Sequence, residues 1–176
     1  AGNYVFRDYG ICPYAASRCE DGGMQIQTSS FNAPTPNGYL GAQNCLRCRH
    51  FITGPAFLGG LLAITNEILL ESNVQSESCA KLQANINQIS EELNRLDEEE
   101  YIANVMRQEF TKTQERLLNE TELRNIEAEY ETAAKKLDML LCDIQCAYSL
   151  ITRCQSLMAV KKDEQQSDKL SLIATS

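Results

Sequence analysis

The sequence predicts a mainly α-helical protein, in which a small irregular zinc-binding head is followed by a long helical hairpin, an antiparallel coiled coil. All nine glycines and all four prolines lie within the first 60 of the 176 residues, where the backbone can turn sharply. Further along, apolar residues recur at alternating spacings of three and four. These observations predict a cysteine-rich head at residues 1–54, a helical arm at 55–160 and a flexible polar tail at 161–176.

Charge is unevenly distributed along the chain. The formal net charge is −8, and residues 1–50 contain four Arg, one Glu and two Asp, a net charge of +1, so residues 51–176 carry −9. An acidic arm argues against binding along nucleic acid or an anionic membrane. The most apolar run, residues 57–70, is too short and too polar to span a membrane, and no signal segment is visible, which predicts a cytoplasmic protein. A start at Ala1 rather than at Met predicts a processed chain or a fragment.

Four of the eight cysteines lie in the head and predict a structural zinc site. Cys45 and Cys48 have two residues between them, the spacing at which two thiolates of one turn reach the same ion. Cys12 and Cys19 would complete a tetrahedral site of four sulfurs, although their spacing is wider than usual. Disulfides and unligated thiols remain as alternatives. Because four thiolates leave no position for a catalytic water, the site predicts no enzyme activity.

The remaining metal-ligating side chains have a simpler interpretation. His50, the only histidine, could replace a cysteine in a Cys3His site, but a packed histidine beside the metal knuckle is the preferred interpretation. Cys154 falls on an apolar helix face and is predicted to be a small core residue. Cys142 and Cys146 are four residues apart on one helix face and could bind a metal with an outside partner or react with oxidants; half-buried helix cysteines are the preferred interpretation. The role of Cys79 is open.

The first helix is predicted to begin at Pro55 and to run into the low seventies, because proline is favoured at the first helical position. Gly59 and Gly60 would let another backbone approach closely. The polar stretch 72–78 predicts a bend or a break. A heptad series follows, and beyond the acidic run 97–100 the apolar series resumes out of phase. The first series is Leu82, Ile86, Ile89, Leu93 and Leu96, and the resumed series is Ile102, Met106 and Phe110, ending near Leu117.

A second heptad series is longer and carries no charge. Its positions are Leu123, Ile126, Tyr130, Ala133, Leu137, Leu140, Ile144, Ala147, Ile151, Cys154 and Met158. Asn119 and Glu122 have the form of a helix amino-terminal cap, so a tight turn is predicted at 118–121. A turn there lets the two apolar stripes bury each other as an antiparallel hairpin, and a continuous helix paired with a second chain is the alternative. Apolar residues off this series need cover from the first helix or a second copy of the chain: Leu141, Tyr148 and Leu157.

Several stretches of the head carry a family resemblance: residues 9–13 (YGICP), 19–23 (CEDGG) and 45–58 (CLRCRHFITGPAFL), with Asn66-Glu67 following. They cover about the first 70 residues and resemble the region after the catalytic domain in bacterial tyrosine-recombinase-like, phage-type integrases of mobile elements. The resemblance implies a cysteine-rich, metal-binding carboxy-terminal extension that helps to hold DNA or other protomers. The recombinase core of such proteins is not in this chain, and neither Tyr4 nor Tyr9 lies in a matching motif.

Two classes of function follow. The first is a non-catalytic accessory module, for a DNA complex or a protein assembly, of an integrase-like DNA recombination protein. The second is a free-standing, zinc-stabilised coiled-coil adaptor or regulator, and a thiol-redox protein is a third candidate. A protein partner or a second copy of the chain is expected on the arm. DNA would bind only through the parent protein or weakly through the arginines of the head: Arg7, Arg18, Arg47 and Arg49.

Overall fold

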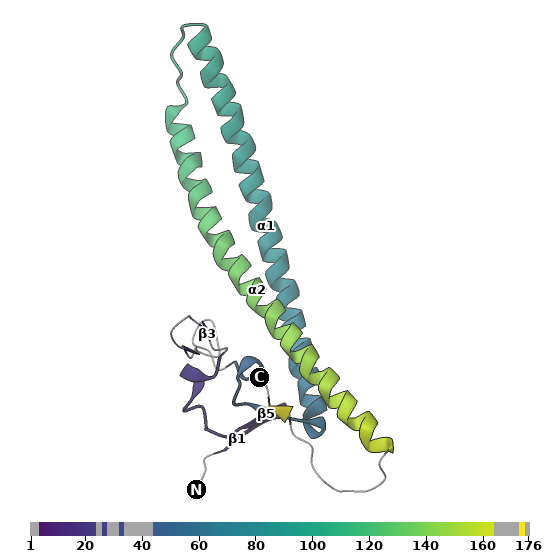
Figure 1. Ribbon diagram of the computed structural model, residues 1–176. Helices are drawn as coiled ribbons and strands as arrows, with labels where there is room; N and C mark the ends of the chain where they lie inside the picture. Colours follow the sequence, from purple (N-terminus) through teal and green to yellow (C-terminus); the bar gives the residue numbers. More distant parts are fainter. Residues whose placement is uncertain (1–3, 24–25, 28–31, 34–43, 164–172, 175–176) are drawn as a thin grey trace. The chain divides into compact units, whose positions relative to one another are not determined.

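The computed structural model describes residues 4–23, 26–27, 32–33, 44–163 and 173–174, and it is mainly helical. Two long helices, α1 (Leu58–Val105) and α2 (Thr113–Asp163), contain most of these residues (Figure 1). The predicted fold class, mainly α with two long helices, is therefore confirmed. Within the described part of the chain, neither helix nor any other has the length and apolar character needed to cross a bilayer.

Both long helices run from one compact unit of the chain into another. Unit 1 comprises Ala1–Glu71 and Met139–Ser176, and unit 2 comprises Ser72–Asp138. The head sequence is thus packed with the first turns of α1 and the last turns of α2. The division between the units does not coincide with the predicted boundary at residue 54.

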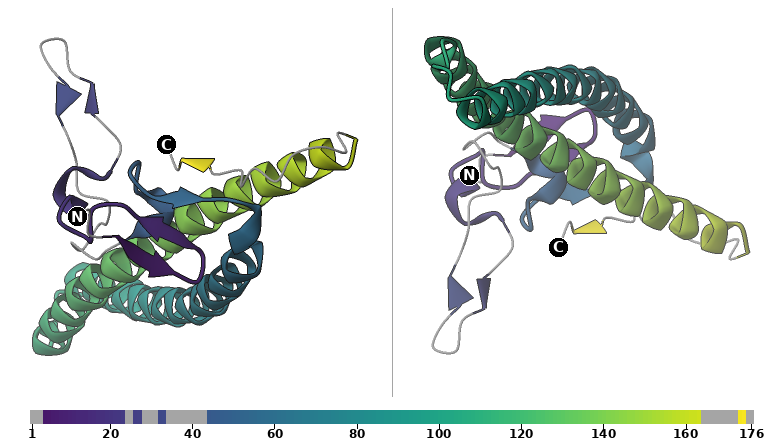
Figure 2. Two further views of the ribbon diagram at one scale, coloured as in Figure 1. Left: turned by 90° about the horizontal axis from the view of Figure 1, so that it is seen from below. Right: turned by 90° about the horizontal axis from the view of Figure 1, so that it is seen from above.

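A small antiparallel sheet frames the head in unit 1. Its strands follow the order β1 (Val5–Arg7), β2 (Gly10–Cys12), β5 (Ile52–Thr53) and β6 (Ile173–Ala174). The first two form a hairpin, purple in Figure 2. A separate ladder joins β3 (Ile26–Gln27) to β4 (Asn32–Ala33). The pairing of β2 with β5 brings the chain before Cys12 next to the chain after Cys48.

Two glycines are required by close backbone approaches. Gly10 has a φ of 156°, and a Cβ there would lie 2.5 Å from the carbonyl oxygen of Ile52. A Cβ on Gly60 would overlap the carbonyl group of Asp8, so the close approach predicted for Gly60 is confirmed. The same prediction for Gly59 is wrong, because nothing lies within 4 Å of the position its Cβ would take.

The apolar core of unit 1 joins the head to both helices. Its buried members are Leu46, Leu61, Ala147, Leu150, Ile151 and Cys154. The placement of Cys154, which is fully buried, confirms the small core residue that the heptad series predicts. Leu157, predicted to need cover, packs against the same cluster. A second cluster consists of Cys45, Cys48 and Phe51, with Tyr9 and Cys12 packed against it.

The start of α1 is as predicted, but its continuity is not. A 3-10 turn, η3 (Pro55–Phe57), precedes α1 and places proline in the first turn. Of the bend or break predicted at 72–78, the break is wrong, since α1 passes through this stretch as a continuous helix. Ser72 is buried there, and the stretch contains no glycine or proline to end a helix.

Within unit 2 the two helices run antiparallel. Close to the connection between them, Arg116 Nη2 lies 3.0 Å from Asp97 Oδ1. Far from it, the side-chain amide of Gln75 donates to the carbonyl oxygen of Ala133 at 3.1 Å. These pairs join residues progressively further from the connection on both helices, as an antiparallel arrangement requires.

The connection spans residues 106–112, so the turn predicted at 118–121 is wrong. Helix α1 ends in a Schellman motif, in which Arg107 is left-handed with a φ of 56° and the amide of Gln108 donates to the carbonyl oxygen of Ala103 at 2.8 Å. Glycine usually occupies the left-handed position. Because Arg107 occupies this position, the sequence lacks the glycine that usually marks the end of a helix.

The predicted cap lies inside a helix. Asn119 and Glu122 are interior residues of α2, which begins at Thr113 with Glu115 in its first turn. An acidic side chain is favoured near the amino-terminal end of a helix, so Glu115 is the residue that indicates the start of α2. Asn119 and Glu122 have ordinary helix-interior propensities, and their spacing alone does not define a start.

The heptad series mark the buried stripes of the two helices. In the first series Leu96 is fully buried and the other four positions are half-buried. In the second, every position is buried or half-buried except Met158. The resumed series does not form a continuous buried stripe: Ile102 and Met106 are exposed, Phe110 is half-buried, and Leu117, near which the series was predicted to end, is exposed.

The predicted flexible tail falls mostly outside the described residues. Helix α2 continues to Asp163, beyond the predicted boundary at 160, and Ile173–Ala174 pairs with β5. Residues 164–172 and 175–176 are not among those described.

The two adjacent glycines of α1 form a matched pair for mutation. We expect Gly60→Ala to lower the free energy of unfolding by about 1–3 kcal/mol, because the added methyl group must displace the backbone at Asp8. Gly59→Ala should be neutral or stabilising by up to about 1 kcal/mol, since its Cβ meets open space and alanine is the better helix former. Chemical denaturation of both variants measures the difference, and equal effects would contradict the close approach at Gly60.

Leu140 and Leu141 form a second matched pair, because they are neighbours on α2 with 7% and 52% exposure. We expect Leu140→Asp to cost about 3–5 kcal/mol, since it places an unpaired charge in an apolar seam. Leu141→Asp should change the free energy of unfolding by no more than about 0.5 kcal/mol. Denaturant titrations followed by circular dichroism report both values, and a tolerated Leu140→Asp would contradict the burial of this stripe.

Candidate functional site

The four cysteines predicted as ligands come from separate short elements of unit 1. Cys12 ends β2, and Cys19 begins the 3-10 turn η1 (Cys19–Asp21). Cys45 begins a second 3-10 turn, η2 (Cys45–Arg47), and Cys48 directly follows it. The amide of Cys48 donates to the carbonyl oxygen of Cys45 at 3.2 Å, which closes the knuckle.

All four cysteines line one cavity. Its volume is about 90 Å³, and its other lining residues come from β1, the loop after β2 and the chain after Cys48. The lining is Val5, Arg7, Cys12, Tyr14, Ala16, Arg18, Cys19, Cys45, Cys48, His50 and Phe51. The fold thus brings together cysteines that are up to 36 residues apart in the sequence, from Cys12 to Cys48.

The thiols of this cavity are not close enough together to coordinate one metal ion. Each of the eight cysteines, all of which are described, is a free thiol. Among the described residues, the His, Cys, Asp and Glu side chains nowhere form a group of three or more that is already spaced to hold a metal ion. Binding an ion here requires the thiol side chains to close around it. Such closure involves the loss of the thiol protons, which a bound cation promotes.

Two neighbouring groups show the low polarity beside the cavity: Cys45, which lines it, and Tyr9, which packs against the cluster that contains Cys45. Burial raises the pKa of the Cys45 thiol, and the neighbouring thiols of Cys12 and Cys48 act in the same direction. Burial, assisted by Cys45, also raises the pKa of Tyr9 to about 12. Both groups are therefore neutral at pH 7 in the absence of a cation. The backbone amide of Ala16 donates a hydrogen bond to Cys12 Sγ at 3.5 Å.

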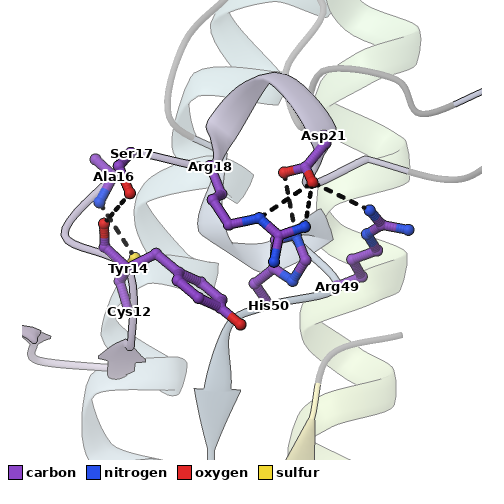
Figure 3. A network of polar contacts seen from close by, with 8 residues as sticks. All are labelled: Cys12, Tyr14, Ala16, Ser17, Arg18, Asp21, Arg49 and His50. Atoms are coloured by element: carbon purple, nitrogen blue, oxygen red, sulfur yellow. Dashed lines mark hydrogen bonds and ion pairs between the residues drawn. The ribbon is translucent and has the colours of Figure 1, made fainter. Parts of the chain in front are cut away.

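Asp21 organises a polar network at the edge of the cavity (Figure 3). Arg18 binds it through Nε at 3.1 Å and through Nη2, and Arg49 Nη2 lies 3.4 Å away. His50 Nε2 is 3.2 Å from Asp21 Oδ1, and its ring packs edge-on against Tyr14 at 5.1 Å between centroids. His50 is thus a packed histidine beside the knuckle that also lines the cavity, and its Nε2 is engaged by a carboxylate.

The knuckle is anchored on α2 by a second polar cluster. Arg47 pairs with Asp143 through Nε and donates from Nη2 to the carbonyl oxygen of Met139 at 3.1 Å. Asn44 donates to the same carboxylate at 2.7 Å. Asp143 is only 8% exposed, so its charge depends on these partners.

The cysteines outside the head are positioned as the preferred interpretation has it. Cys142 and Cys146 are half-buried on α2, and burial raises the pKa of the Cys146 thiol. Arg47, which lies nearby, opposes this shift. Cys79 is buried in unit 2. None of these three cysteines lines the cavity of the head.

Sequence reasoning missed the two aspartates that organise the head. Asp143 could have been found, because it is the only charged residue between Asp138 and Arg153, in a mostly apolar stretch of the predicted helix. Asp21 gave no signal beyond its closeness to Cys19.

Comparisons with protein-family models, with curated proteins and with solved structures found no match. The function must therefore be argued from the site.

The Asp21 network leads to a prediction about pH. Hydrogen bonding to Arg18 is the main cause that lowers the pKa of Asp21 from 3.8 to about 2, with a smaller contribution from His50. A carboxyl whose pKa is lowered on folding stabilises the fold above its unfolded pKa, and the contribution is lost as the pH falls from about 4 to about 2. Arg18→Gln should raise the pKa of Asp21 towards 3.8, as measured by NMR titration of its carboxyl carbon.

Arg49→Gln is the matched control, because Arg49 lies further from the carboxylate at 3.4 Å and has no main part in the shift. It should leave the Asp21 midpoint nearly unchanged. A larger change in Arg49→Gln than in Arg18→Gln would contradict the assignment.

Proposed function

We propose that this chain is a non-catalytic accessory module of an integrase-like DNA recombination protein, in which structural zinc holds the head and the helical arm binds protein. The observation that carries the proposal is the convergence of Cys12, Cys19, Cys45 and Cys48 on one cavity. The integrase context comes from the sequence resemblance of the head. The same proposal includes a coiled coil formed by the two helices, because the buried positions of both follow heptad spacing.

The donor set fits structural zinc. Four cysteine sulfurs are a common ligand set for a closed tetrahedral site, and the two-residue spacing of Cys45 and Cys48 is typical of one. A small head with short strands and few core residues also needs such a staple to be stable. When bound, zinc would supply structural cross-linking and no reaction.

The arginines of the head favour a protein-assembly role over direct DNA binding. Arg18 and Arg49 pair with Asp21, and Arg47 pairs with Asp143. Arg18 and Arg49 share one carboxylate, and Arg47 is paired with a residue of α2, so their charge is partly compensated within unit 1, which weakens their attraction for phosphates. DNA contact by the parent protein is compatible with this role.

The arm offers apolar surface to a protein partner. Beside the connection of unit 2, several large apolar side chains are at least half exposed: Tyr101, Ile102, Val105, Met106, Leu117 and Leu118. In unit 1, Tyr148 on α2 is 69% exposed. Exposed apolar groups of this kind are typical of interaction surfaces.

A catalytic role for the tyrosines of the head is disfavoured. A nucleophilic tyrosine must lose its proton, and the pKa of Tyr9 is raised to about 12. Tyr4 is exposed at 62%, outside the polar networks of the head. The alternative, a free-standing zinc-stabilised adaptor, would use the same surfaces, and the reading frame of the full-length protein separates the two.

Zinc content tests the proposal. Protein purified under reducing conditions should contain about one zinc per chain by elemental analysis, since four thiolates form one closed site. Cys45→Ser should lose the metal and lower Tm, by about 2–4 °C for each kcal/mol lost. Cys79→Ser, which changes a buried cysteine of unit 2, should retain the metal.

Metal-free wild-type protein with an unchanged fold, or an unchanged Tm in Cys45→Ser, would contradict the zinc site. Release of the metal by His50→Ala would instead establish the Cys3His arrangement. Light scattering over a wide concentration range then separates self-association of the arm from binding of a different protein.

A further inference from the structure

The two residues between Cys45 and Cys48 both contact α2. Leu46 is 5% exposed and lies in the core of unit 1 with Ala147 and Leu150. Arg47 binds the carboxylate and carbonyl groups of the same helix. The loop that carries two candidate zinc ligands is therefore also the loop that docks on α2.

The geometry of the 3-10 turn explains why the two cysteines line the cavity while the two residues between them contact α2. In a 3-10 helix with three residues per turn, side chains three positions apart lie on the same side. Cys45 and Cys48 are three apart and both line the cavity, whereas Leu46 and Arg47 project from the other sides of the turn towards α2. Because these four residues share one short stretch of backbone, any backbone shift that brings the two cysteines closer to an ion also moves Leu46 and Arg47.

The docked side cannot adjust freely. Asp143 is nearly buried, and its carboxylate accepts hydrogen bonds from Arg47 and from Asn44, the latter at 2.7 Å. A buried charge that loses its partner is strongly destabilising, so the turn has one favoured orientation on α2.

We propose that metal binding at the knuckle and docking of the knuckle on α2 are thermodynamically coupled, so that loss of the ion releases residues 139–154 of α2 from the head. This inference rests on the proposed zinc site. Coupling is reciprocal: if the ion strengthens docking, then docking strengthens binding of the ion by the same factor. The module would then hold or release its arm according to metal or thiol state.

The reciprocity gives a test that uses no activity. Zinc affinity is measured on the whole chain under reducing conditions by competition with a chromophoric chelator. Asp143→Asn should weaken zinc binding roughly fivefold or more, although Asp143 lines no part of the cavity. Asn44→Ala removes one hydrogen bond of the same cluster and should act in the same direction with a smaller effect, which serves if Asp143→Asn fails to fold.

Two controls separate coupling from simple loss of stability. Asp138→Asn makes the same chemical change at an exposed site on the same helix and should leave zinc affinity unchanged. Leu96→Ala removes a fully buried side chain of unit 2 and destabilises the fold without touching the knuckle. While the protein stays folded, global destabilisation alone does not alter affinity, so Leu96→Ala should bind zinc as the wild type does.

The outcomes distinguish this inference from the function on which it rests. Weakened zinc binding in Asp143→Asn and Asn44→Ala, but in neither control, supports coupling. Wild-type affinity in folded Asp143→Asn overturns coupling and leaves the zinc site standing, as does equal weakening in Leu96→Ala. Absence of zinc binding in the wild type overturns both proposals.

Discussion

A nearly buried carboxylate sets the arrangement of unit 1. Asp143 sits in an apolar part of α2, where an unpaired charge costs several kcal/mol (roughly 3–5). Its partners, Arg47 and Asn44, both come from the knuckle loop, so burial of the helix face is possible only while this loop lies against it. Leu46 enters the apolar core at the same place, and polar and apolar docking therefore depend on one turn of 3-10 helix. The rest of the head is built outward from that turn through Phe51, β5 and the pairing of β5 with β2.

The other end of the head is fixed by a close approach of backbone to helix. The carbonyl of Asp8 lies where a side chain of residue 60 would be, so glycine at this position sets how deeply the β1–β2 hairpin packs against α1. Both contacts act on the cysteine cavity, since Cys12 is the last residue of the hairpin and Cys45 begins the knuckle turn. The cavity is thus held by contacts to α1 on one side and to α2 on the other. This explains why unit 1 combines the head with parts of both helices and does not end at residue 54.

Features that depend on a repeated pattern or on residue type, such as the buried helix stripes, could be predicted from the sequence. Features that depend on one local conformation or on one long-range contact, such as the position of the connection, could not. Heptad spacing placed Leu96, Leu140 and Ala147 correctly in buried stripes, because each repeat adds to the same signal. The position of the connection was missed, because Arg107 occupies a left-handed site that glycine would normally mark. The head cysteines stood out by their spacing and residue type, whereas Asp143 and Asp21 act largely through partners that are distant in sequence, such as Asn44 and His50. Strands of two or three residues are too short to show alternation.

The distribution of charge then bears on what the module recognises. In unit 1, Arg18 and Arg49 share the carboxylate of Asp21 and Arg47 pairs with Asp143, so each of these three arginines already has an acidic partner. Such pairs gain their value from geometry, and an incoming phosphate would have to replace a partner already in place. The large apolar side chains beside the connection of unit 2, by contrast, are not buried: Tyr101 is 71% exposed and Leu118 is 66% exposed. The proposed assembly role therefore rests on the exposed apolar groups of unit 2, because such groups are typical of protein interaction surfaces, whereas these three arginines of unit 1 already have acidic partners within unit 1.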